Sequence, residues 1–190
     1  AEIHALQESG EKSTGATVYV TLEPCSHAGR TSPCVDALIE AKVTRVVCAL
    51  IDPNPEISGA GIDRLQQAGI EVQCGLMAEQ AEELNEGFLS RMRRGRPYVR
   101  VKLAQSTDGH VALPDGSSQW ISGPQARADV QRWRARSDAI LTGVGTVLAD
   151  DPSLNVRLDD HHAQPLRVIV DSRWRTPPSA RLLGLEGEVV

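Results

Sequence analysis

The sequence predicts an α/β protein with a largely parallel sheet, organised as two domains. Segments rich in β-branched residues alternate with helical patterns along the chain, and this order is typical of strands joined by helices. The continuous apolar run RVVCAL at residues 45–50 has the composition of a buried strand. The basic stretch RRGRP at residues 93–97 interrupts the alternation, so we expect one domain over residues 1–94 and a second over residues 95–190.

The first domain is expected to alternate regularly between strands and helices. ATVYVTLEP alternates apolar and polar residues, as a strand does. SPCVDALIEAK follows as a helix, with Ser32 as its cap and Pro33 in its first turn. Glycines at positions 10 and 69 end two further helices. The predicted helices cover residues 2–9, 32–42, 59–69 and 78–94, and the predicted strands cover residues 16–24, 45–50 and 70–75.

The second domain is also predicted to be α/β. YVRVKLAQSTDGHVA at residues 98–112 indicates a strand, a turn and a second strand. A helix is expected over residues 123–137, followed by a strand, a glycine turn and a short helix over residues 138–150. PLRVIVDS at residues 165–172 predicts one more strand.

Composition excludes several classes of function. The chain of 190 residues is 41% hydrophobic but only 3% aromatic, so its core must be mainly aliphatic. A net charge of −5 argues against a general nucleic-acid binder, which needs a basic face, although a local phosphate pocket is compatible with it. No apolar run approaches the roughly 18 residues of a membrane span. Four cysteines without a dense framework suit a reducing compartment, so we expect a cytoplasmic protein that binds neither nucleic acid nor membranes.

Two of the cysteines, Cys25 and Cys34, each follow a proline within TLEPCSHAGRTSPC. A disulfide, a metal site and two buried thiols are competing interpretations. The compartment argues against a disulfide, and buried thiols better describe Cys48 and Cys74, which lie inside predicted strands. Cys34 lies in the first turn of a predicted helix, where the helix N-terminus should lower the thiol pKa and favour the thiolate that zinc requires. The spacing alone is moderate evidence, because the tighter zinc pattern has two residues between its cysteines.

The start of the chain favours the metal site. Zinc nucleobase deaminases carry His-x-Glu, then Pro-Cys, then a second Cys. Glu2 fits the glutamate, and the histidine would directly precede Ala1. An imidazole and two thiolates would hold the zinc and leave its fourth position for water. The glutamate would carry the water's proton to the ring and to the leaving amine. Taken alone, a glutamate at this position is more often an ordinary solvated helix residue, but its place before the Pro-Cys strand reverses that preference.

Several longer motifs closely resemble the bifunctional riboflavin-biosynthesis deaminase–reductase family. They are AEIHAL, TLEPCSHAGRTSPC, DPNP and GAGIDRLQQAGI, followed by RPYVRVKLAQSTDGHVA, SSQWISG, RWRARSDAILTGVGTVLADDPSLNVR and PLRVIVDS. The resemblance implies a cytidine-deaminase-like three-layer domain, incomplete at its start, and a dihydrofolate-reductase-like α/β domain, incomplete at its end. It also implies zinc-dependent deamination of a 2,5-diamino-6-ribosylamino-pyrimidinone 5′-phosphate, followed by reduction of the ribosyl group to ribityl with NADPH.

For the first domain, the resemblance implies that Cys25 and Cys34 bind Zn²⁺ and that Glu2 is catalytic. It implies four substrate contacts, which are His27, Arg30, Asp52 and Asn54. A guanidinium and an imidazole suit a phosphate and its ribose. A solvated loop is an equally good interpretation of His27 and Arg30.

In the second domain, the residue patterns leave alternatives open. Lys102, on a predicted strand, either binds a phosphate or ribosyl oxygen or faces water from an edge. Gly143 and Gly145 form a Gly-x-Gly turn after the predicted strand that begins at residue 138. This turn either presents backbone N–H groups to a phosphate or is only a tight turn. The arginines of RWRAR either bind a phosphate or form a solvated face, and Trp120 could be a core residue. The resemblance implies NADPH contacts at Ala104, Trp120, Gly143, Gly145, Thr146 and Asp150, and substrate contacts at Lys102, Ser118, Arg134, Leu154 and Arg157.

The sequence departs from the family's pattern at both ends, because the zinc histidine and the glycine-rich cofactor loop are missing. We therefore expect a piece of a longer protein, with weak zinc binding and little reductase activity of its own. One alternative is a deaminase with a degenerate second domain. Another is a non-catalytic α/β protein whose structural zinc site is closed by His4 and His27. The expected partner is a small pyrimidine ribosyl phosphate, and a homo-oligomer is expected.

Overall fold

The computed structural model describes residues 1–27, 32–55, 57–160 and 163–190. The chain forms two compact units, Ala1–Val101 and Lys102–Val190. Among the described residues, no helix is both long and apolar enough to cross a membrane.

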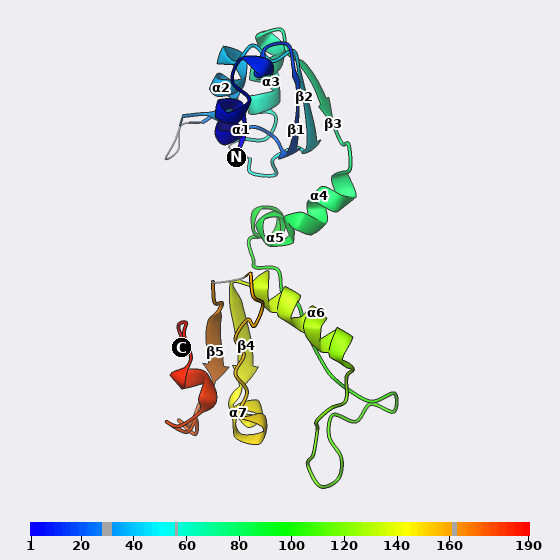
Figure 1. Ribbon diagram of the computed structural model, residues 1–190, viewed down its shortest axis with the longest axis vertical. Coiled ribbons are helices and arrows are strands. Elements are labelled where there is room, and N and C mark those ends of the chain that lie inside the picture. Colours follow the sequence, from blue (N-terminus) through cyan, green and yellow to red (C-terminus); the bar gives the residue numbers. More distant parts are fainter. Residues whose placement is uncertain (28–31, 56, 161–162) are drawn as a thin grey trace. The chain divides into compact units, whose positions relative to one another are not determined.

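The first unit is built on a three-stranded parallel sheet in the order β1-β2-β3 (Figure 1). The strands are β1 (Thr17–Leu22), β2 (Arg45–Leu50) and β3 (Glu71–Cys74). Helix α2 (Cys34–Glu40) connects β1 to β2, and α3 (Ala60–Gln67) connects β2 to β3. The predicted alternation and the buried strand at residues 45–50 are confirmed. Because the strands are parallel, the segments that follow β1 and β2 leave the sheet at the same edge.

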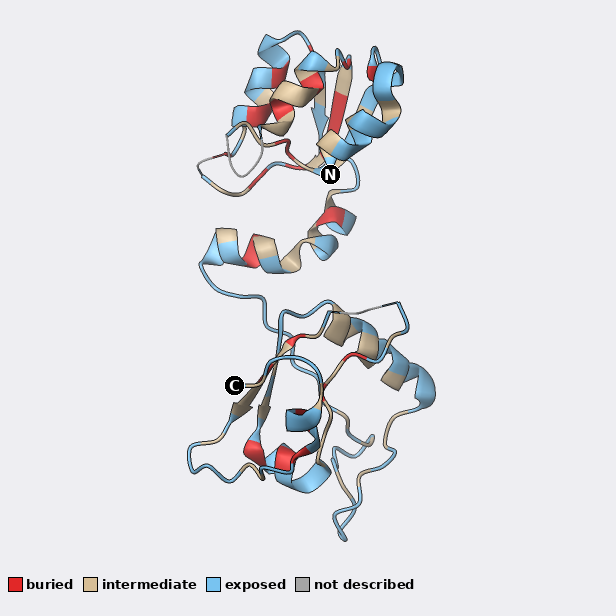
Figure 2. Cartoon of the chain, turned by 60° about the vertical axis from the view of Figure 1, so that its left-hand side comes forward, coloured by how far each residue is buried: buried red, intermediate tan, exposed pale blue. Residues whose placement is uncertain are grey.

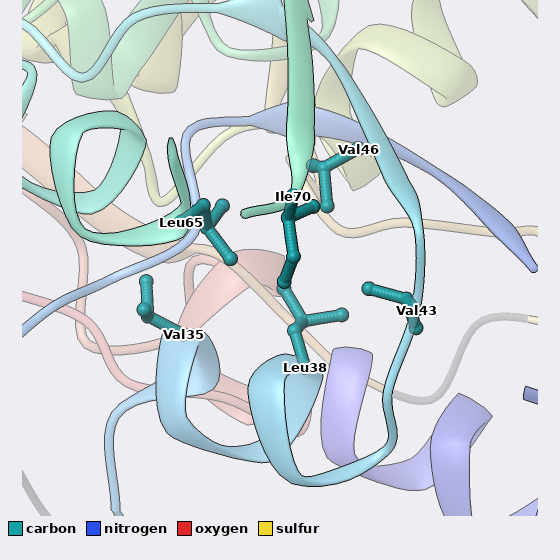
Figure 3. Close-up of a cluster of buried hydrophobic side chains, with 6 residues drawn as sticks. All are labelled: Val35, Leu38, Val43, Val46, Leu65 and Ile70. Atoms are coloured by element: carbon teal, nitrogen blue, oxygen red, sulfur yellow. The ribbon is translucent and has the colours of Figure 1, made fainter. Parts of the chain in front are cut away.

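Aliphatic side chains fill the core between this sheet and its helices (Figure 3). Leu38 of α2 and Leu65 of α3 are fully buried and belong to one cluster with Val46 of β2. Helix α1 (Glu2–Ser9) contributes the partly buried Leu6 to this cluster and ends at Gly10, as the sequence predicts. A short 3-10 helix, η1 (Gly10–Ser13), follows.

Three local predictions for the first unit are wrong. The helix expected over residues 78–94 is divided into α4 (Ala78–Leu84) and α5 (Glu86–Arg94). Asn85 leaves the helical conformation with φ −115° and ψ 19°, and its side-chain Nδ2 donates to the Ala81 carbonyl at 2.9 Å. An asparagine side chain that bonds the backbone in this way competes with the helix. Ser32 does not cap α2, because Pro33 occupies the N-cap position.

The third wrong prediction concerns Cys74. It pairs in register with the buried Cys48, and their sulfurs lie 2.8 Å apart, but Cys74 itself is exposed. Strand β3 is an edge strand of this sheet, so a residue at its end has one neighbouring strand instead of two. Burial, together with the Cys74 thiol, raises the pKa of Cys48 to about 12.

The second unit contains a two-stranded parallel sheet of β4 (Ala139–Gly143) and β5 (Leu166–Val170). Helix α6 (Pro124–Ala135) precedes β4 and has no buried residue, as the colouring of Figure 2 shows. Helix α7 (Val144–Asp150) follows β4, and a 3-10 helix, η2 (Arg181–Gly184), lies near the C-terminal end. Val147 of α7 and Leu182 of η2 belong to the small core of this unit. The predicted elements over residues 123–137, 138–150 and 165–172 are confirmed.

The predicted strand–turn–strand at residues 98–112 is only partly correct. The turn forms, with the Gly109 N–H donating to the Ser106 carbonyl at 2.9 Å. Neither strand forms, and Val99, Val101 and Leu103 are all exposed. An alternating segment becomes a strand only when a neighbour supplies the ladder hydrogen bonds, and no described strand pairs with this one. Lys102 therefore lies on an exposed, non-strand segment, and its placement on a strand was wrong.

Candidate functional site

The two prolyl-cysteine segments meet beside the end of β1. Cys25 follows the strand, and Cys34 is the first residue of α2. The Cys34 N–H donates to Cys25 Sγ at 3.3 Å, and the Val35 N–H donates to the Cys25 carbonyl at 3.2 Å. Both thiols are free and half-buried. These two hydrogen bonds hold Cys25 and Cys34 side by side.

Glu2 reaches the same point from the first turn of α1. The Cys34 thiol donates to Glu2 Oε2 at 3.3 Å. Partial burial acts to raise the pKa of the Glu2 carboxyl. Hydrogen bonds from the backbone and from Cys34, together with the positively charged amino group of Ala1, outweigh burial, and the pKa lies below its usual value. Glu2 is therefore a carboxylate held against the cysteine pair.

The pKa of Cys34 changes in the opposite direction from the one expected. Burial, followed by the hydrogen bonds with Cys25 and Glu2, raises this pKa to about 12. The prediction that the helix N-terminus lowers this pKa is wrong, because burial and the neighbouring Cys25 and Glu2 side chains act in the opposite direction. Without a cation, this arrangement concentrates groups that become negatively charged, and a bound metal would offset that charge.

The donor set fits zinc in part. Two thiols within reach of one point are the soft ligands that zinc prefers, and a catalytic zinc site uses three protein ligands. Within the described ranges, no three His, Cys, Asp or Glu side chains are grouped closely enough to hold a metal ion. His4 and His27 are both exposed, so the described residues do not form the closed four-ligand site of the structural alternative. Cys25 and Cys34 could thus supply two of the three protein ligands of a catalytic zinc site.

The turn after β2 carries the next two predicted residues. Asp52 is buried, and its Oδ1 accepts the Asn54 N–H at 2.8 Å. The Asn54 carbonyl accepts the N–H groups of Ile57 and Ser58, each at 2.9 Å. The turn is thus held in one shape by its own polar groups. His27 is exposed and lies two residues after Cys25, in the segment between Cys25 and Cys34 that we call the cysteine loop. Arg30 lies outside the described residues.

Glu23 is the residue of this site that sequence reasoning missed. Its side chain is buried, and its carboxylate accepts four backbone N–H groups from the segment at residues 52–62. The only local signal was an acidic residue directly after a predicted strand and before Pro24. The four donors are 29 to 39 residues away along the chain, so no local pattern identifies them.

In the second unit, the structure brings three of the predicted substrate residues together. Arg134 of α6 donates through Nη1 to the Asn155 carbonyl at 3.1 Å, and Arg157 donates through Nη1 to Asn155 Oδ1 at 3.1 Å. Leu154, next to Asn155, is buried. Burial, followed by the positive charge of Arg157, lowers the pKa of Arg134. Two guanidinium groups therefore lie close enough to repel each other.

The other predicted residues of this unit lie on separate segments. Ala104 and Ser118 are half-buried within the irregular stretch before α6. Trp120 is 69% exposed and stacks with the Arg127 guanidinium, which lies 4.4 Å from its ring centre, so a core position for Trp120 is excluded. Gly143 ends β4, and the exposed residues of α7 include Gly145, Thr146 and Asp150. An added Cβ at either glycine would meet only open space.

Comparisons with known proteins relate both units to one kind of enzyme. Residues 1–50 match the cytidine and deoxycytidylate deaminase zinc-binding region, and residues 97–190 match the RibD C-terminal domain. The riboflavin biosynthesis protein RibD of Escherichia coli is 56% identical over 99% of this chain, and the match covers 54% of that protein. The chain thus spans about half the length of the curated relatives it matches.

Solved structures agree with this relation. Acinetobacter baumannii RibD superimposes with a TM-score of 0.88 at 52% identity, covering 96% of this chain and 53% of its own. A diaminohydroxyphosphoribosylaminopyrimidine deaminase/5-amino-6-(5-phosphoribosylamino)uracil reductase from Thermotoga maritima gives a TM-score of 0.90 at 38% identity, covering all of this chain and 54% of its own. The chain is therefore an α/β homologue of the RibD bifunctional deaminase–reductases of riboflavin biosynthesis.

Proposed function

We propose that the protein carrying this chain deaminates a 2,5-diamino-6-ribosylamino-pyrimidinone 5′-phosphate and reduces the ribosyl group of the product to ribityl with NADPH. The observation that carries the proposal is the meeting of Cys25, Cys34 and Glu2 at one point of a zinc-binding deaminase region. The names of the relatives support the order of the two reactions and the class of substrate. A cytoplasmic location and a homo-oligomer remain predictions from the sequence.

In the deamination, Cys25 and Cys34 would hold Zn²⁺ as thiolates. Bound zinc lowers the pKa of water toward neutrality and so supplies the nucleophile. Glu2 would take up one proton of that water on a carboxylate oxygen and deliver it to the ring nitrogen. It would then carry a second proton, from the hydroxyl group added to the ring, to the departing amine. The contact of Glu2 Oε2 with the Cys34 thiol places this carboxylate beside the proposed metal ligands, where it can act as the base.

The remaining polar residues of the first unit would bind and orient the substrate. Asp52 and Asn54 stand on a turn that leaves the sheet at the same edge as the cysteine loop, so their positions suit contacts with the pyrimidine or ribose. His27 and Arg30 would reach the phosphate end of the substrate from the cysteine loop.

In the reduction, Arg134 and Arg157 would bind the substrate phosphate. Two guanidinium groups close together repel each other until an anion lies between them, and their planar forks match phosphate oxygens. Leu154, Ser118 and Lys102 would complete the substrate contacts. NADPH would contact the β4–α7 junction and nearby segments through Ala104, Trp120, Gly143, Gly145, Thr146 and Asp150.

The decisive test separates proton transfer from metal binding at the first site. We expect Glu2→Gln to lower the deamination rate by about 10²- to 10⁴-fold while zinc content is unchanged, because an amide cannot carry the proton. Cys34→Ser should lose zinc and activity together. Glu8→Gln, on the exposed face of the same helix, is the matched control and should behave like the unchanged protein. Full deamination by Glu2→Gln would contradict the proposal.

A further inference from the structure

The Glu23 carboxylate joins segments that are distant in sequence. Oε1 accepts the N–H groups of Gly61 at 2.9 Å and Ile62 at 3.3 Å. Oε2 accepts the N–H groups of Asp52 at 3.1 Å and Gly59 at 3.0 Å. The side chain is buried, with only 4% of the residue exposed. Burying a carboxylate is costly unless it is fully hydrogen-bonded, and here each oxygen has two donors.

The backbone of Glu23 fixes its place in the fold. Its N–H donates to the Leu50 carbonyl at 2.8 Å and so continues the pairing of β1 with β2. The side chain then crosses to the turn after β2 and to the beginning of α3, where exposed N–H groups favour a negative charge. Glu23 therefore connects the strand that leads to Cys25 with the whole segment at residues 52–62.

Gly61 shows how closely these segments approach each other. A Cβ built on Gly61 would lie 2.1 Å from the Pro24 carbonyl oxygen and 3.1 Å from Glu23 Oε1. The backbone atom cannot give way as a flexible side chain could, so only glycine permits this contact. Arg64 of α3 strengthens the approach by pairing with Asp36 of α2 at 2.5 Å.

We propose that Glu23 is a positioning residue that holds the turn at Asp52 and Asn54 against the segment at residues 23–25 and so shapes the substrate side of the deaminase site. The inference rests on the proposed function. The cysteines have their own support, because the Cys34 and Val35 N–H groups bind Cys25 directly. Glu23 instead binds the turn at Asp52 and the beginning of α3. Its loss should therefore weaken substrate binding while the metal ligands keep their places.

The test is Glu23→Gln, which keeps the shape of the side chain but replaces one acceptor oxygen with an NH₂ group facing two N–H donors. We expect faster amide hydrogen exchange at two or more of Asp52, Gly59, Gly61 and Ile62, measured by NMR. We also expect KM for the deaminase substrate to rise about tenfold or more, with kcat and zinc content nearly unchanged, because bonds to a buried charged group are strong. Glu40→Gln, at the exposed end of α2, is the control and should change neither readout.

A second variant addresses the case in which Glu23→Gln does not fold. Gly61→Ala leaves every charge in place but pushes α3 away from Pro24, so it should also raise KM with little change in kcat. If amide hydrogen exchange and KM in Glu23→Gln are both the same as in the wild type, the inference is overturned. Loss of zinc, or a fall in kcat without a rise in KM, would also overturn it. If Glu23→Gln is unfolded, an unchanged KM in Gly61→Ala would overturn it.

The substrate role of the turn is tested separately. Asp52→Asn and Asn54→Ala should each raise KM if the turn contacts the substrate. If both leave KM unchanged, the proposed substrate contacts fail, whereas the hydrogen-exchange result still decides whether Glu23 holds the segment. If both raise KM and Glu23→Gln does not, the positioning role alone is wrong.

Discussion

Arg134 and Arg157 show what single residues contribute to the second unit. Both bond to Asn155, and the charge of Arg157 acts with burial to lower the pKa of Arg134. We expect Arg134→Lys to raise KM for the phosphorylated substrate of the reductase by about tenfold, because an ammonium group cannot bind phosphate through two parallel hydrogen bonds. Steady-state kinetics would measure this, with the exposed Arg132→Lys on the same helix as the control. Equal KM values for the two variants would exclude a phosphate contact at Arg134.

Individual residues of the candidate site also show where sequence reasoning succeeds and where it fails. The pairing of Cys25 with Cys34 could be predicted, because both lie on one short loop between a strand and a helix. The pKa of Cys34 could not be predicted, since it depends on burial in the folded protein and on a carboxylate 32 residues away. The role of Glu23 was missed for the same reason, because its donors belong to another loop and another helix. Local patterns identify which residues are reactive, but tertiary contacts decide their charge state.

The helices of the first unit depend on their shared core for stability. Leu38 of α2 is fully buried within the aliphatic cluster, with Val43 and Leu65 among its members. We expect Leu38→Ala to lower the free energy of unfolding by about 2 to 5 kcal/mol, because it removes buried methyl groups and leaves a cavity. Urea denaturation would measure the loss. Leu84→Ala, at a site that is 69% exposed, should cost far less, and a similar cost for both would mean that the core is not where the structure places it.

Elements with strong local signals were predicted well. Gly10 ends α1, and the apolar run at residues 45–50 is β2. The wrong predictions concern segments whose conformation depends on hydrogen bonds that the sequence pattern does not reveal. Asn85 interrupts a helical pattern by bonding to Ala81, and the alternating segment at residues 98–104 has no described strand to pair with. A strand depends on its neighbour, so periodicity alone cannot decide whether one forms.

Over the whole molecule, the two family regions fall on different structural units. The deaminase zinc-binding region covers residues 1–50 of the first unit. The RibD C-terminal region begins at residue 97 and extends through the second unit. Each unit has its own sheet and its own buried cluster among the described residues. The residues proposed for deamination therefore lie in the first structural unit, and those proposed for reduction lie in the second.

This division predicts that the two reactions can be separated by mutation in the protein that carries the chain. Glu2→Gln should abolish deamination but leave NADPH oxidation intact when the deaminated product is supplied, because Glu2 is fixed by contacts with Cys34 in the first unit. Arg134→Lys should impair only the reduction, because its partner Asn155 lies in the second unit. Each variant would be assayed with the substrate of each step. A fall in the reduction rate of Glu2→Gln with the deaminated substrate would show that the first site acts on the second reaction, and the assignment of one reaction to each unit would then be wrong.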